Sequence, residues 1–124
     1  MSLLRPEIYL CPEDFTAIQQ AMAQAPQDQG AHLLAREIRR AHLVPANRLP
    51  AASVRLNSQV AFLDNDELEI GSVKVVLPAA ATREDRTSVT SLLGAALIGL
   101  SVGDTMGWRE PDGAERMVTV TRVD

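Results

Sequence analysis

The sequence has few aromatic residues, one cysteine and no excess of positive charge. Aromatic side chains make up 3% of its 124 residues, so stacking platforms for single-stranded nucleic acid are nearly absent. Cys11 is the single cysteine, which excludes an internal disulfide and is consistent with a reducing compartment. The net charge of −4 argues against a general attraction to DNA or anionic membranes. No basic stretch followed by an apolar one opens the chain, so we expect no export signal and a cytoplasmic location.

The motifs of common catalytic and metal sites are also missing. No Gly-Lys-Ser/Thr sequence forms a phosphate loop. His32 and His42 stand ten residues apart in the N-terminal part, far from the C-terminal serines and from any cysteine, so neither a catalytic serine nor a zinc site is expected. The acidic residues 64–69 do not match a calcium loop, because Leu68 takes the fifth position and no glycine takes the sixth. We therefore expect no catalytic residue, no metal ion and no cofactor.

Apolar residues are abundant, at 46% of the chain, which is enough for the core of one domain. The charges are unevenly placed. Residues 1–52 carry five arginines and five acids, whereas residues 53–124 carry seven basic and eleven acidic residues. The prolines and asparagine of residues 45–50 are typical of a linker. We predict an N-terminal unit at residues 1–48 and a C-terminal unit at residues 53–124.

Two helices are predicted in the N-terminal unit. Pro12 suits the first position of one helix, Asp28 can cap the next, and Pro45 is expected to end it. Apolar residues recur at helical spacing, namely Phe15, Ile18 and Met22 in the first helix and Ala31, Leu34, Ile38 and Ala41 in the second. These two seams predict a short antiparallel helical hairpin with coiled-coil-like packing. Each helix is marginal alone and needs a partner.

Three arginines, Arg36, Arg39 and Arg40, are predicted on the outer face of the second helix. Glu37 lies three residues before Arg40 and can neutralise part of this charge. Two interpretations stay open. The arginines either form a solvated face or contact an acidic partner surface or phosphates.

The C-terminal unit predicts about five strands and one short helix. The apolar alternation of residues 54–62 shifts its phase at Asn57 and Ser58, which indicates a bulge or a bend. The other predicted features are a turn at 64–67, a strand at 68–77 with a bulge at Gly71, a loop at 78–85, a strand at 86–91, and a hairpin of 105–110 with 116–123 around residues 111–113. Val118 and Val120 are expected in the core, and Trp108 on one sheet face.

The apolar stretch that begins at Leu92 predicts a short helix packed on the sheet. Gly94, Gly99 and Gly103 punctuate it, and it is far shorter than the ~20 apolar residues of a membrane span. Together these elements predict an α+β fold in which an antiparallel sheet carries the helix on one face.

Residues 91–104, Ser-Leu-Leu-Gly-Ala-Ala-Leu-Ile-Gly-Leu-Ser-Val-Gly-Asp, resemble the signature of the C-terminal domain of bacterial Gre-type transcription factors. The resemblance extends over residues 53–123 and is strongest to the Rnk type, the regulators of nucleoside diphosphate kinase. The residues that carry it are Trp108, the Pro-Asp-Gly turn at 111–113, and the upstream pattern of Val54, Asn57, Ser58, Val60 and Phe62. It implies an FKBP-like version of the antiparallel domain.

The resemblance also implies a partner, bacterial RNA polymerase. In Gre factors the loop before the signature helix touches the polymerase rim, and the matching positions are Thr90, Ser91 and Leu92. Thr90 stands where the family has an acid, and Leu92 stands where it has proline. An exposed Leu92 with Leu93 nearby is expected to form an apolar patch of the kind that partners bury.

Gre factors stimulate RNA cleavage with acids at the tip of a long coiled coil, which help to hold a catalytic Mg²⁺. This needs two neighbouring carboxylates, whereas the predicted tip offers only Asp28. A helix of roughly 14 residues spans only about 20 Å. We therefore expect a non-catalytic transcription elongation regulator that binds RNA polymerase near the secondary channel, without transcript cleavage.

Two alternatives remain from the sequence. An FKBP-like peptidyl-prolyl isomerase is suggested by fold analogy alone, and its site would need an aromatic pocket that four aromatic residues hardly supply. The second alternative is a generic protein-interaction module with another partner. The resemblance to the family also implies an association with DNA binding, but we expect no sequence-specific nucleic-acid binding by this chain itself. We also expect no membrane partner.

Overall fold

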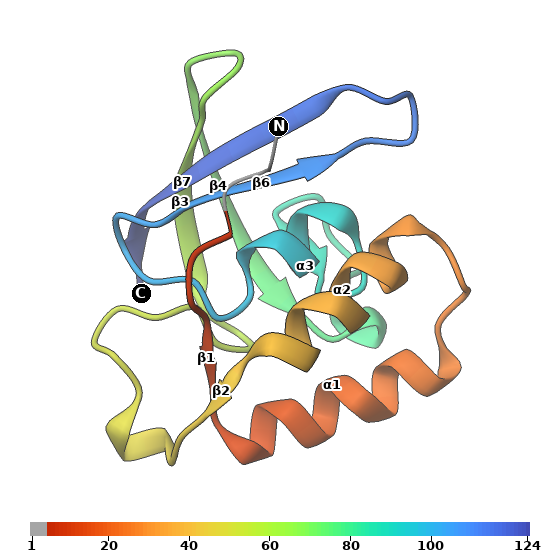
Figure 1. The fold of residues 1–124 in the computed structure, drawn as a ribbon, viewed down its shortest axis with the longest axis vertical. Coiled ribbons are helices and arrows are strands. Elements are labelled where there is room, and N and C mark those ends of the chain that lie inside the picture. Colours follow the sequence, from red (N-terminus) through yellow and green to blue (C-terminus); the bar gives the residue numbers. More distant parts are fainter. Residues whose placement is uncertain (1–4) are drawn as a thin grey trace.

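Three α-helices and a five-stranded sheet make up most of the computed structural model, which describes residues 5–124 (Figure 1). The α+β fold is thus confirmed. The elements in chain order are β1 (Tyr9–Leu10), α1 (Pro12–Gln24), α2 (Gln29–Arg40), β2 (His42–Leu43), the 3-10 helix η1 (Ala46–Arg48), β3 (Gln59–Asp64), β4 (Glu69–Val76), the 3-10 helix η2 (Pro78–Ala80), β5 (Arg86–Ser88), α3 (Leu92–Leu97), β6 (Thr105–Arg109) and β7 (Glu115–Val123). None of the helices in the described part has the length and apolar character needed to cross a membrane.

The large sheet is mixed, with strand order β5-β4-β3-β7-β6. Three of its strand pairs are antiparallel, but β4 and β5 run parallel. The prediction of a purely antiparallel sheet was therefore wrong at this edge. Parallel neighbours need a crossover connection rather than a tight turn, and residues 77–85, which include η2, supply it.

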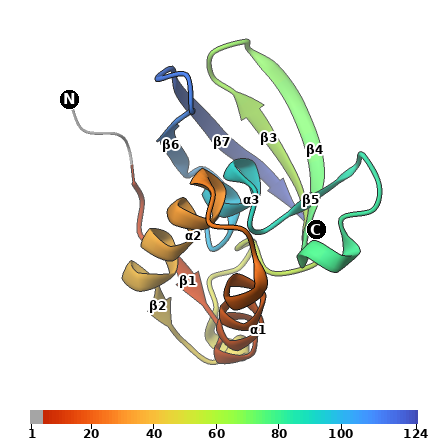
Figure 2. The same cartoon turned by 90° about the vertical axis from the view of Figure 1, so that its right-hand side faces the viewer.

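The three helices lie on one side of this sheet, with α3 between the sheet and α2 (Figure 2). The α2 residues Leu33, Leu34 and Ile38 are buried, whereas α1 buries only Ile18 and Asp14. The contacts of α2 are mainly with α3 and only to a small extent with α1. The two predicted helices are confirmed, but the expectation that their seams chiefly face each other was wrong.

A short parallel pair of strands, β1 and β2, ties the N-terminal segment to the end of α2. The Tyr9 N–H donates to the Gly99 carbonyl at 3.2 Å, and the His42 N–H donates to the Ile8 carbonyl at 2.9 Å. Because the chain becomes extended at Ala41 to enter β2, α2 ends at Arg40 and not at Pro45 as expected. Neither strand was predicted from the sequence, because two-residue strands show no alternation.

The described parts of both predicted units contribute to one hydrophobic cluster. Ile18 and Leu34 belong to it together with Val60 and Val118 of the sheet. The predicted core positions Val118 and Val120 and the packing of Trp108 are confirmed, since all three are buried. The division into residues 1–48 and 53–124 stays a prediction, and residues 1–4 lie outside the described residues.

The turns follow the sequence signals with one exception. Asn57 has φ +74°, so the predicted bend lies in a turn before β3. The predicted bulge at Gly71 was wrong: β3 and β4 pair without a shift there, and a Cβ at Gly71 would meet the Phe62 ring at 2.6 Å. The shift lies between Ala61 and Phe62, where β3 pairs with β7.

The strand predicted over residues 86–91 is shorter, because β5 ends at Ser88. The hairpin of β6 and β7 forms around residues 111–113 as expected, with Gly113 at φ +89°. The acidic turn predicted at 64–67 joins β3 to β4.

Candidate functional site

The loop that leads into α3, residues 87–91, is held together by its own hydroxyl groups; we call it the hydroxyl loop. Ser91 caps α3: its Oγ accepts from the Gly94 N–H at 3.1 Å and donates to the Ser88 carbonyl at 2.7 Å. Thr87 Oγ1 lies 2.8 Å from Ser91 Oγ, and Ser88 Oγ lies 2.8 Å from Thr90 Oγ1. Because these bonds fix the loop before any partner arrives, binding would cost little ordering entropy.

Two glycines allow backbones to meet at the hydroxyl loop. A Cβ on Gly94 would collide with the Ser88 carbonyl oxygen, so α3 lies directly against the loop. A Cβ on Gly30, in the first turn of α2, would collide with the Thr90 carbonyl oxygen and lie 2.9 Å from the Ser91 carbonyl carbon. Real side chains essentially never approach backbone so closely. The start of α2 therefore sets the position of the hydroxyl loop.

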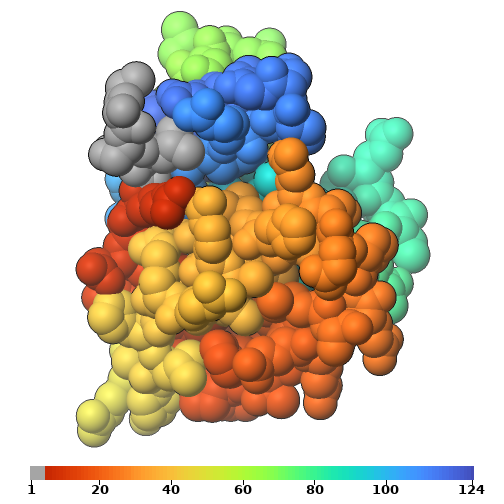
Figure 3. Space-filling view, turned by 45° about the vertical axis from the view of Figure 1, so that its right-hand side comes forward, coloured from red at the N-terminus to blue at the C-terminus, as the bar shows by residue number. Residues whose placement is uncertain are grey.

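Leu92 and Leu93 do not form the exposed apolar patch that was expected. Both are half-buried and pack against the hydrophobic cluster. The physical reason is α2, which covers most of α3 on the face seen in Figure 3 and whose Gly30 lies against the Leu92 backbone nitrogen. Thr90 and Ser91 are also half-buried. The structure thus brings the four predicted docking residues together, with only part of each side chain accessible.

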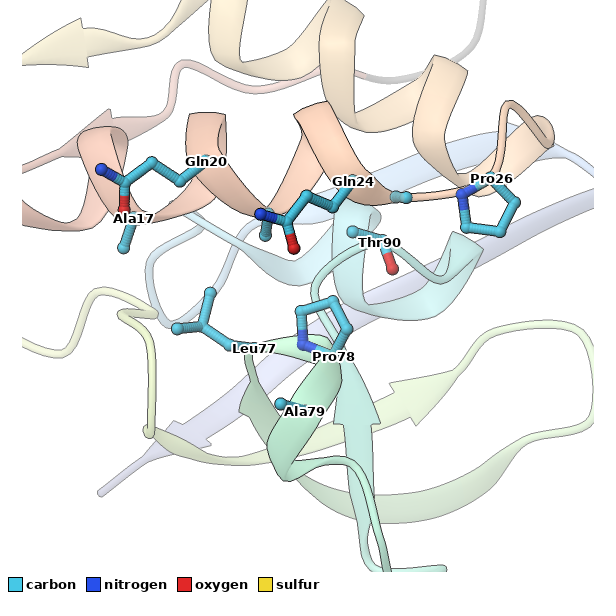
Figure 4. A pocket seen from close by; sticks show the side chains of 10 residues that line it. Ala17, Gln20, Gln24, Pro26, Leu77, Pro78, Ala79 and Thr90 are labelled. Atoms are coloured by element: carbon cyan, nitrogen blue, oxygen red, sulfur yellow. The ribbon is translucent and has the colours of Figure 1, made fainter.

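A groove of about 430 Å³ lies beside the hydroxyl loop, between α1 and η2. Thr90 lies between Gln24 on one wall and Pro78 on the other (Figure 4). The residues that line the groove are mostly small and apolar, and none is aromatic: Ala17, Gln20, Ala21, Gln24, Ala25, Pro26, Leu77, Pro78, Ala79 and Thr90. An apolar side chain of a protein partner fits such a lining, with the two glutamines able to bind its backbone.

This groove was not predicted from the sequence. Its two walls are about 60 residues apart in the chain, and their approach depends on how α1 rests beside η2. The one local signal is the pair Ala17 and Ala21, small residues one helical turn apart.

Arg40 does not lie on an open basic face, which corrects the prediction for this residue. Its guanidinium binds both carboxylate oxygens of Glu37, at 2.9 and 2.6 Å, and donates to the Pro6 carbonyl at 2.6 Å. Glu37 is 2% exposed, and its hydrogen bond is the main factor that raises the pKa of Arg40 above its ordinary value. Arg36 and Arg39 are exposed, and their contact with an acidic partner or phosphates stays a prediction.

The tip between α1 and α2 holds one acid, Asp28, which is already engaged. Its Oδ1 accepts from the Ala31 N–H at 2.9 Å and so caps α2. The helices contain 13 and 12 residues, and at 1.5 Å per residue each spans about 20 Å or less. Within residues 5–124, no three His, Cys, Asp or Glu side chains are grouped in a way that could hold a metal ion.

The acidic turn after β3 is built around Asp64. Although burial opposes its charge, bonds from the backbone N–H groups of Glu67 and Asp66 and from Arg116 lower the pKa of Asp64 below its ordinary value. Arg116 also lies near Glu110, at 3.5 Å. The Asp64 carboxylate thus has a structural role, linking the β3–β4 turn to β7.

Comparison with known families matches residues 49–124 to the model described as "Transcription elongation factor, GreA/GreB, C-term". Over 95 residues the chain is 33% identical to the regulator of nucleoside diphosphate kinase from Escherichia coli (strain K12). The aligned residues make up 76% of this chain and 70% of that protein. It is 34% identical over 79 residues to the transcription elongation factor GreA of Methylobacterium sp. (strain 4-46), covering 63% of this chain and 50% of that protein.

Among solved structures, the prokaryotic transcription elongation factor GreA/GreB from Nitrosomonas europaea is similar, with a TM-score of 0.74 and 27% identity. The match covers 96% of this chain and 98% of that one. The similarity therefore includes the helices as well as the sheet.

Proposed function

The chain belongs to the GreA/GreB family of transcription elongation factors, and from this premise we propose that it is a non-catalytic regulator that binds bacterial RNA polymerase near the secondary channel. The match of residues 49–124 to the family model supports the kind of partner. The similarity to a regulator of nucleoside diphosphate kinase supports the regulatory class. Nothing in the chemistry of the described side chains calls for a direct action on a kinase.

The observation that carries the proposal is the internally hydrogen-bonded hydroxyl loop beside an apolar groove. Thr90 belongs to both, since it bonds to Ser88 within the loop and lines the groove between α1 and η2. The accessible parts of Ser91, Leu92 and Leu93 continue this surface onto α3. We infer that a polymerase side chain enters the groove while the loop contacts the neighbouring backbone, which buries the apolar lining.

Transcript cleavage is not part of the proposed function. Metal-assisted cleavage needs a pair of carboxylates that can reach the polymerase active centre. Asp28 is the one acid at the tip, so no second carboxylate stands beside it. Its own carboxylate caps α2. The helices are also short, and α2 is packed against α3, so the tip stays close to the body of the protein.

Peptidyl-prolyl isomerisation gains no support from the groove. Such a site requires aromatic walls around the proline ring, and the groove is lined by alanine, proline, leucine, glutamine and threonine. The other alternative is a generic interaction module with another partner. The binding test below distinguishes it, because such a module would not be retained by RNA polymerase.

The test is the retention of variants by immobilised core RNA polymerase. Thr90→Arg places a long cation in the groove, and Thr121→Arg, the same change at an exposed position on β7, is the matched control. We expect wild type and Thr121→Arg to bind alike, and Thr90→Arg and Leu92→Asp to bind at least about tenfold more weakly, or ~1.4 kcal/mol. Equal retention of all four proteins would reject this docking surface, and no retention of wild type would reject the partner.

A second assay tests the absence of cleavage. Purified wild-type protein is added to a backtracked elongation complex, and the rate of RNA cleavage is compared with that of the polymerase alone. We expect no change in rate. An accelerated rate that Asp28→Asn abolishes would show that the single tip acid is sufficient and that this part of the proposal is wrong.

A further inference from the structure

The outer edge of β4 is open along residues 69–73. Its neighbour β5 pairs only with residues 74–76, and the hairpin of β3 and β4 stands clear of the helices (Figure 2). Glu69, Ile70 and Ser72 are exposed on this segment. A sheet edge with unpaired backbone groups is a ready template for another strand.

The backbone groups that face this edge belong to alternate residues. The Lys74 N–H donates outward to the Asp85 carbonyl beside β5 at 2.9 Å, whereas the Val75 N–H donates inward to the Ser58 carbonyl at 3.1 Å. Because backbone groups alternate along a strand, the N–H and C=O groups of Ile70 and Ser72 also point outward. Both residues thus offer a donor and an acceptor to an incoming strand.

Large apolar side chains lie beside these groups. Leu68 is 77% exposed and Ile70 is 68% exposed. Leu68 also has φ +58°, a left-handed conformation that is unusual for a residue of its size. Scattered exposed apolar residues are normal, but two of them next to an open edge form a surface that pairing would cover.

Opposite charges flank the two ends of the edge. The tip carries Asp66 and Glu67, both exposed, whereas Lys74 and Arg86 lie in register beside each other at the other end. Arg83, Glu84 and Asp85 also belong to this end, and Arg83 is paired with Asp85 at 3.3 Å, so the three basic and two acidic side chains leave a net charge of +1. A strand that pairs antiparallel must therefore be acidic where it meets Lys74 and basic where it meets the tip.

We propose that this edge pairs antiparallel with the same edge of a second copy of the chain, about a two-fold axis at Gly71. In that register Ile70 lies opposite Ser72 of the second copy, and each such pair exchanges both of its hydrogen bonds. Gly71 lies opposite its own counterpart, where the lack of a side chain lets the backbones approach. Beyond Glu69 the tip of each copy, with Glu67, passes beside Lys74 and Arg86 of the other outside the plane of the sheet, because Arg86 already fills the edge next to Lys74.

The charge pattern selects a second copy over another extended strand. A two-fold interface requires one surface to complement itself, so that residue i meets j and j meets i. The edge satisfies this requirement because its acidic and basic ends exchange places under the axis. The interface is small, so we expect a weak dimer whose population depends on concentration.

The first test compares two variants at one position. Ser72→Pro removes the outward N–H, a change that edge strands tolerate, whereas Ser72→Ala keeps it; both lose the 2.9 Å bond from Gln59 to the serine hydroxyl. Sedimentation is measured at protein concentrations from about 10 µM to about 1 mM, the range in which weak interfaces associate. The apparent mass of wild type and of Ser72→Ala should rise above the 13.4 kDa of one chain as the concentration increases. The Ser72→Pro mass should stay constant, with an unchanged circular dichroism spectrum.

The second test exchanges charges. Glu67→Lys alone and Lys74→Glu alone each place like charges at both ends of the dimer, so self-association should weaken by at least about threefold in each. Mixing the two variants restores opposite charges at both ends, and the mixture should associate as strongly as wild type. A wild-type chain that stays monomeric, a Ser72→Pro variant that still dimerises, or a mixture without recovery would overturn the proposal. Neither test involves polymerase, so either can fail independently of the proposed function.

Discussion

The hydroxyl loop and the β3–β4 hairpin show two opposite ways to present a surface. In the hydroxyl loop every side-chain hydroxyl has a partner, and two glycines bring backbones into direct contact. In the hairpin the outward backbone groups of Ile70 and Ser72 face an open edge, and Leu68 and Ile70 are exposed. The comparison suggests that the first region is ready for a partner of fixed shape, whereas the second suits a strand.

The largest effect is expected where the loop depends on backbone contact. Gly94→Ala should lower the free energy of unfolding by about 3 kcal/mol, because the added methyl collides with the Ser88 carbonyl. Denaturant unfolding measures the loss. The control is Gly113→Ala at the β6–β7 turn, where φ +89° causes strain but no atom lies within 4 Å of the added Cβ. A Gly94→Ala loss no larger than that of the control would contradict the packing.

The next effect tests whether α2 positions the loop. Gly30→Ala replaces a poor helix former with the best one, yet it should destabilise the protein by about 2 kcal/mol, because the methyl collides with the Thr90 carbonyl. It should also weaken retention by core polymerase. An increase in stability would show that the loop moves easily away from α2.

For the β3–β4 hairpin, the free energy of unfolding is expected to depend on pH. The pKa of Asp64 is lowered, so its contribution is present at pH values above its ordinary 3.8 and is lost as the pH falls through the lower, folded value. Asp64→Asn should cost about 1–2 kcal/mol at neutral pH. Below about pH 4 the difference from wild type should shrink, and thermal unfolding at several pH values measures it. A difference that does not change with pH would assign the cost to packing.

The smallest effect concerns the tip of α1 and α2. Asp28→Ala removes the cap of α2 and should cost about 1 kcal/mol. Because we assign this acid no catalytic part, polymerase binding should not change by more than the loss of folded protein explains. A thermal melt and the retention assay together provide the check.

Local chemistry accounts for what the sequence could predict. Pro12 and Asp28 marked the helix starts, Asn57 and Gly113 marked turns, and the pattern of residues 91–104 indicated the family. These signals lie within a few residues of the feature that they specify, so no knowledge of the fold was needed.

Long-range packing accounts for what was missed. The contact of α2 with α3 and the groove each join segments that are far apart in the chain. The parallel β4–β5 pair joins residues that are closer, such as Lys74 and Arg86, but it depends on the path of the crossover through η2. Arg40 shows the limit well: its partner Glu37 was identified, but the Pro6 carbonyl that turns the pair inward is 34 residues away. Leu92 was expected to be exposed because nothing in its own neighbourhood indicated that Gly30 lies against it.

The most direct test of the central claim is hydrogen exchange on dilute protein with and without core RNA polymerase. We predict that polymerase slows exchange at residues 87–97, which include the hydroxyl loop and α3, and in the second half of α1, while residues 66–73 of the hairpin exchange unchanged. Slower exchange confined to the hairpin, or no change anywhere at saturating polymerase, would contradict the account.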